Sequence, residues 1–62
     1  MIIPSNDVCA AVIDQMLTEG FDMTEWEESF CESNSTRKEF TDRQKEIITK
    51  FMDKYEFRNL PR

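Results

Sequence analysis

Histidine is absent from the 62-residue sequence, which also holds only one glycine and two prolines. Without histidine the chain lacks the most frequent general base and the most frequent metal ligand of proteins. It contains no glycine-rich phosphate loop and no GxSxG nucleophile motif, and its acidic residues do not follow EF-hand spacing. The sequence therefore predicts a protein that is not an enzyme and has no catalytic residues, no cofactor and no metal site.

Cysteine is also scarce: Cys9 and Cys31 form no CxxC pair and can make at most one disulfide. The first residues include no basic region before their apolar ones and reach a charge at Asp7, so we expect no secretory signal. We therefore expect a cytoplasmic protein whose thiols are reduced and act as small apolar side chains. No apolar run approaches the length of a membrane span, so we expect no membrane partner.

Positive charge is missing from the first half of the chain. Residues 1–32 contain eight acidic residues and no Lys or Arg, whereas residues 33–62 contain eight bases and five acids. The halves therefore carry −8 and +3, within a net charge of −5. Two explanations stay open: the halves neutralise each other when they pack, or the acidic half offers a surface to a basic partner.

Apolar residues recur with helical periodicity in three stretches, which predict helices at residues 6–19, 24–33 and 42–56. Each stretch begins with side chains able to cap backbone N–H groups: Ser5 or Asn6, Thr24 with Glu27, and Thr41 with Gln44. Gly20 stands where a glycine ends a helix. With no strand signal and so short a length, the sequence predicts one all-α domain over residues 1–62, a small three-helix bundle.

The apolar stripes predict which side chains form the core. In the first helix they are Val8, Cys9, Val12, Ile13, Met16 and Leu17. In the second, Met23, Trp26 and Phe30 are expected to face inward, and the glutamates, including Glu27 and Glu28, to be solvated. In the third they are Ile47, Ile48, Phe51, Met52 and Tyr55, with Phe57 and Leu60 folding back from the tail.

An acidic and aromatic stretch, residues 19–32, is the first candidate binding site. Glu25, Glu28 and Glu32 recur at i, i+3 and i+7 and should form one ridge on the second helix. Asp22 and Trp26 complete the candidate partner-binding set, since tryptophan often dominates binding energy. Such carboxylates can also imitate a phosphate backbone. The alternative is that the rings belong to the core and the glutamates only hydrate the outer face.

A basic cluster around the start of the third helix is the second candidate site. Arg37, Lys38, Arg43 and Lys45 gather there, beside backbone N–H groups that point outward. The cluster can bind phosphate and so favours a nucleic acid as ligand. The acidic net charge opposes this, and the alternative is a solvated loop whose bases pair with acids of the second helix.

Residues 26–55 resemble a helical segment of small phage and mobile-element proteins associated with DNA metabolism. The resemblance rests on the Trp26–Glu27 start, Arg37 in the connecting loop, the capping Thr41 and Gln44. It implies a phage-encoded protein that acts in the host cytoplasm on replication, transcription or defence machinery. Proteins of that kind often inhibit a host enzyme by binding it.

The leading hypothesis is accordingly a non-enzymatic module that binds a basic protein surface and inhibits or modulates a nucleic-acid-handling enzyme. A nucleic-acid-binding accessory domain is the alternative. A third hypothesis is a homodimer whose paired helices complete a core that is small for one chain.

Overall fold

Three helices, each begun by a hydroxyl side chain, make up the computed structural model, which describes residues 3–58 and 60. They are α1 (Asn6–Thr18), α2 (Glu25–Ser33) and α3 (Asp42–Lys54). Ser5 caps α1 by accepting a hydrogen bond from the Val8 N–H. Complete capping boxes begin α2 and α3, at Thr24 with Glu27 and at Thr41 with Gln44. The predicted helix starts and the all-α class are confirmed.

The helix ends follow from backbone conformation. Glu19 closes α1 and Gly20 follows with φ +66°, a left-handed conformation that glycine adopts without strain. Tyr55 has extended backbone angles, φ −117° and ψ 156°, and so ends α3. The observed end of α3 lies two residues before the predicted end near residue 56, and the Tyr55 hydroxyl contacts Glu27 of α2.

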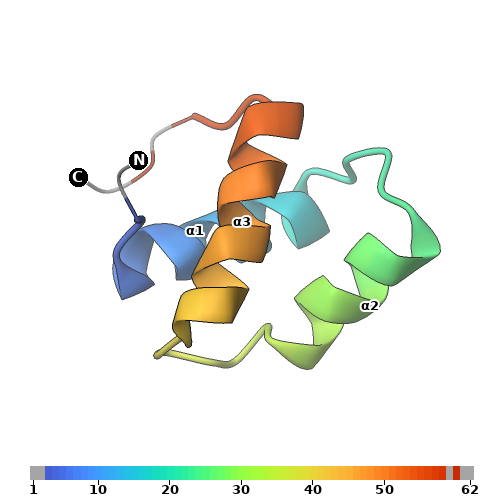
Figure 1. Ribbon diagram of the computed structural model, residues 1–62. Helices are drawn as coiled ribbons and strands as arrows, with labels where there is room; N and C mark the ends of the chain where they lie inside the picture. The colour runs from blue at the N-terminus through green and yellow to red at the C-terminus, as the bar shows by residue number, and fades with distance from the viewer. Residues whose placement is uncertain (1–2, 59, 61–62) are drawn as a thin grey trace.

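Helix α1 lies at the centre of the arrangement. Both α2 and α3 pack against it, whereas the backbones of α2 and α3 stay further from each other (Figure 1). The space between α2 and α3 is therefore bridged by side chains alone. No helix within the described residues has the length and apolar content needed to cross a bilayer.

The core gathers apolar side chains from every helix: Cys9, Val12, Ile13, Met16, Cys31, Phe40, Ile48 and Phe51. Four of them form the predicted stripe of α1, and Phe57 and Leu60 pack against the core as predicted. Both cysteines are free and fully buried, so they act as small apolar residues. Burial raises the pKa of the Cys9 thiol, and raises that of Cys31 to about 11.

Phe40 enters the core from the connection between α2 and α3. Its backbone N–H donates a 3.1 Å hydrogen bond to the Asn6 side chain at the start of α1. This contact fixes the point at which the connecting chain crosses α1 and begins α3. Phe40 was not among the predicted core residues.

Candidate functional site

Glu27 is buried, contrary to the expectation that it is solvated. Only 7% of it is exposed. Its Oε1 accepts hydrogen bonds from the Thr24 N–H at 2.9 Å and from the Tyr55 hydroxyl at 2.7 Å. Its Oε2 accepts one from the Lys54 ammonium at 3.0 Å. Three donors thus surround the carboxylate, and two of them come from the C-terminal end of α3.

The charge of Glu27 is stabilised by these donors. Burial alone would raise the pKa of this carboxyl, but the bonds from Thr24, Tyr55 and Lys54 outweigh it and lower the pKa to about 2. The bond to Glu27 in turn raises the pKa of Lys54 and that of Tyr55. Glu27 therefore joins α2 to α3 as an anion at neutral pH.

Trp26 lies on the flank of α2 and leaves 58% of its surface exposed. It stacks on Phe30 with ring centroids 5.5 Å apart and meets the edge of Phe51 at 6.4 Å. Of the two possibilities left open for this ring, a core residue or a binding residue, the structure excludes the first. The buried residues of α2 are Glu27 and Cys31, which lie about one turn apart. Trp26 is adjacent to Glu27 in the chain, so the two side chains point about 100° apart around the helix axis.

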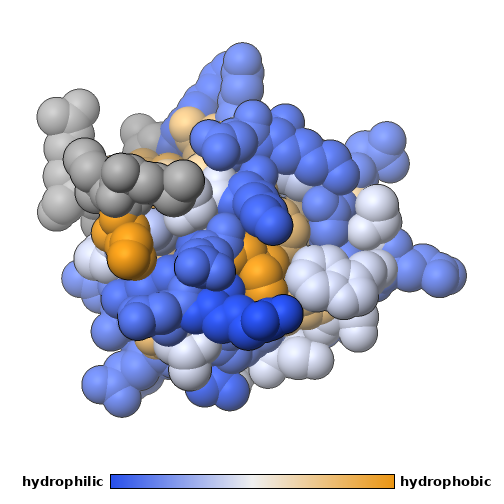
Figure 2. All heavy atoms as spheres, viewed as in Figure 1, coloured by the Kyte–Doolittle hydropathy of each residue, from blue (hydrophilic) through white to orange (hydrophobic). Residues whose placement is uncertain are grey.

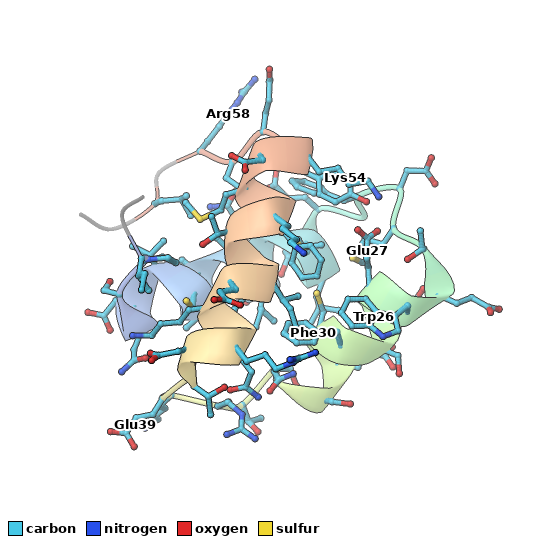
Figure 3. The ribbon with its side chains drawn as sticks, viewed as in Figure 1. Trp26, Glu27, Phe30, Glu39, Lys54 and Arg58 are labelled. Carbon is cyan, nitrogen blue, oxygen red and sulfur yellow. The ribbon has the colours of Figure 1, made fainter. Side chains whose placement is uncertain are left out.

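A groove between α2 and α3 runs beside Trp26 (Figure 3). This α2–α3 groove has a volume of about 310 Å³ and is lined by Thr24, Trp26, Glu27, Ile47, Lys50, Phe51 and Lys54. Figure 2, viewed from the same side, shows apolar side chains reaching the surface there among hydrophilic ones. A second hollow, beside Ser29 and Ser33, lies on the other side of the indole. The Trp26 ring therefore lines both the α2–α3 groove and the second hollow.

The acidic ridge of α2, formed by Glu25, Glu28 and Glu32, is exposed as predicted, and Asp22 is exposed beside it. Within residues 3–58 and 60, the single ion pair joins Lys54 to Glu27. The ridge carboxylates thus make no ion pair with any described base. Trp26 and the three ridge glutamates lie on α2, and Asp22 lies in the connection that precedes this helix.

The second candidate site divides in the structure. Arg37 donates a 2.8 Å hydrogen bond from Nε to the side-chain oxygen of buried Asn34, which also receives a bond from Gln44. Arg37 therefore helps to hold the connection between α2 and α3. Lys38 and Arg43 are exposed and Lys45 is half-buried. The expected pairing of these bases with acids of α2 is not observed among the described residues.

Comparisons with protein-family models, with characterised proteins and with solved structures find no match to this chain. The resemblance to phage and mobile-element proteins stays a prediction. Trp26 and the acidic ridge are the features of the surface that bear most directly on function.

Proposed function

We propose that the protein is a small protein-binding module whose docking surface consists of Trp26 and the acidic ridge of α2. The observation that carries the proposal is the exposure of Trp26, 58%, in a chain whose core is small. Burying a large ring favours folding, so a 62-residue protein gains stability from every ring it encloses. An indole left outside, between two hollows, instead offers the kind of anchor that dominates protein interfaces.

The charge around Trp26 defines the partner that we propose. The ridge carboxylates lack ion-pair partners among the described residues, so a surface rich in Lys and Arg would supply them. Surfaces of that sort line the channels of nucleic-acid-handling proteins, where carboxylates on a helix can take the place of phosphates. The finer proposal is a phage-type inhibitor or modulator of such an enzyme in the host cytoplasm.

The test is capture of a partner by the immobilised chain, followed by affinity measurements on variants. We expect Trp26→Ala to weaken binding by at least about tenfold, the usual effect of losing a central tryptophan. Changing Glu25, Glu28 and Glu32 together to Gln should mainly slow association and flatten its salt dependence. Lys38→Gln, exposed and outside the proposed surface, is the matched control and should bind normally.

The opposite pattern would reject the proposal. If the parent binds oligonucleotides, and changing Arg37, Lys38, Arg43 and Lys45 abolishes that binding while the triple-Gln variant is unaffected, the chain is a nucleic-acid-binding domain.

A further inference from the structure

We infer that the α2–α3 groove binds a second copy of the chain, so that the free protein forms a two-fold symmetric dimer centred on Trp26. The inference goes beyond the proposed function, because it concerns the protein without any foreign partner. It follows from the distribution of charge on the two sides of the groove.

The α3 side of the groove is basic. Lys50 and Lys54 line it together with the apolar Ile47. Arg43 lies one turn before Ile47, and the spacing i, i+4, i+7, i+11 places the four residues along one flank of α3. This flank faces α2, and Lys54 keeps half of its side chain exposed although it also binds Glu27. The α3 wall therefore presents positive charge beside an apolar floor of Ile47 and Phe51.

The part of α2 that lies outside the groove has the opposite sign. Beyond the ring of Trp26, the outer face of α2 carries the exposed acidic ridge and no base. Across this face of the molecule, positive charge thus gives way to an exposed apolar centre and then to negative charge. A ligand that fits it must carry an apolar anchor between an acidic part, which meets α3, and a basic part, which meets α2.

A second copy of the chain satisfies that requirement. In a two-fold contact the same patch meets itself, and each residue exchanges places with its counterpart. Rotation by half a turn about an axis through the Trp26 region lays the acidic ridge of one copy over the basic flank of the other, twice. Each indole then faces the open groove of the other copy. A patch with only one sign of charge would repel its own copy. This patch carries both signs and is therefore complementary to itself.

A single-stranded nucleic acid is the competing occupant, since lysines beside an exposed ring are typical of sites where bases stack. The acidic ridge on the same face repels a polyanion, and the chain as a whole carries −5. A second copy brings its own carboxylates to the lysines and places its lysines on the carboxylates. The distribution of charge therefore favours self-association.

The first measurement combines sedimentation equilibrium with fluorescence over a concentration series of the purified chain. Trp26 is the only tryptophan, so its emission reports directly on the proposed contact. We expect the mass to double and the emission to shift to shorter wavelength over the same concentrations. Trp26→Ala should raise the dimer dissociation constant by at least about tenfold. A single-chain mass up to the solubility limit, with unchanged emission, would overturn the inference.

The second measurement uses charge reversal, which tests the geometry of the contact. One variant carries Glu25→Lys and Glu32→Lys, and the other carries Arg43→Glu and Lys50→Glu; Lys54 is left because it holds Glu27. Each variant alone should be monomeric, because like charges face each other across the axis. Mixed in equal amounts, they should form heterodimers, because both contacts again join opposite charges. Asp14→Lys on α1 and Lys38→Glu, both exposed elsewhere, are matched controls that should dimerise normally.

Circular dichroism of each variant shows whether it folds, so loss of the dimer is distinguishable from unfolding. Failure of the mixture to restore dimers of folded variants would overturn the two-fold arrangement. Quenching of Trp26 by a single-stranded oligonucleotide, in a chain that stays monomeric, would replace the second copy by a nucleic acid. A chain that stays monomeric without binding an oligonucleotide can still capture a foreign protein, so this inference can fail while the proposed function holds.

Discussion

Helices α1 and α2 use their inward faces differently. The inward face of α1 consists of Cys9, Val12, Ile13 and Met16, all apolar. That of α2 consists of Glu27 and Cys31, while the largest ring of the helix stays outside. The inward face of the first helix is held by apolar burial. The second is held by a directed polar contact, which leaves its apolar flank available for binding.

The largest expected effects belong to the buried core, which α1 supplies with four side chains. Ile13→Ala should lower the free energy of unfolding by about 2–5 kcal/mol, because it removes buried carbons and leaves a cavity. Small domains are stable by about 5 kcal/mol or somewhat more, so much of the chain should unfold at moderate temperature. Thermal unfolding followed by circular dichroism measures this. A stable, cooperatively folded variant would contradict the assignment of α1 as the centre of the core.

The next effect belongs to Glu27 and depends on pH. Its pKa in the folded chain, about 2, is below the ordinary 4.5, so the unfolded chain takes up this proton more readily. The contribution to stability is complete above pH 4.5 and is lost as the pH falls toward 2. A difference of that size corresponds to about 3 kcal/mol. Urea unfolding at a series of pH values checks the direction and the window.

Glu27→Gln is the matched control for that experiment. It keeps the shape of the side chain and an oxygen for the Thr24 N–H, but it removes the charge that Lys54 meets. Near neutral pH the variant should be less stable than the parent, and the gap should shrink in acid. A gap that is independent of pH would mean that Glu27 has an ordinary pKa in the folded chain and that its charge does not contribute to stability.

The smallest effect on folding is expected at Trp26. Trp26→Ala should cost only about 1 kcal/mol, since the ring is mostly exposed and contributes chiefly its stacking on Phe30. Phe51→Ala, at a buried ring in contact with both, should cost about 3–5 kcal/mol. Chemical denaturation of the two variants side by side measures the difference. Equal losses would place Trp26 in the core and remove the main support for the docking surface.

Local sequence patterns suffice for α1 but not for α2. In the first helix, serine capping and a glycine stop predict the two ends, and one apolar stripe predicts the inward face. In α2 the stripe of Met23, Trp26 and Phe30 is apolar, yet the helix turns Glu27 inward. The reason lies outside the segment: Lys54 and Tyr55, far along the chain, supply the donors that make burial of a carboxylate favourable. Periodicity within one helix contains no information about such partners.

The candidate site shows the same division. The exposed acidic ridge follows from its spacing and was predicted. The exposure of Trp26 depends on which side of α2 faces inward, so the sequence left open whether this ring is buried. Phe40 was missed because it stands alone between a polar loop and the cap of α3, where no periodic pattern marks it. Arg37 belongs to the predicted basic cluster, but its contact with Asn34 depends on how the connection folds.

Burial of both thiols makes the two cysteines reporters of opening. Neither Cys9 nor Cys31 has exposed surface, and burial keeps their pKa values above the ordinary value. A thiol reagent therefore reacts with them only after α1 and α2 have separated, however much reagent surrounds the folded molecule. The rate at which such labels accumulate measures how often the interior becomes accessible, without any denaturant and without altering a single residue of the chain.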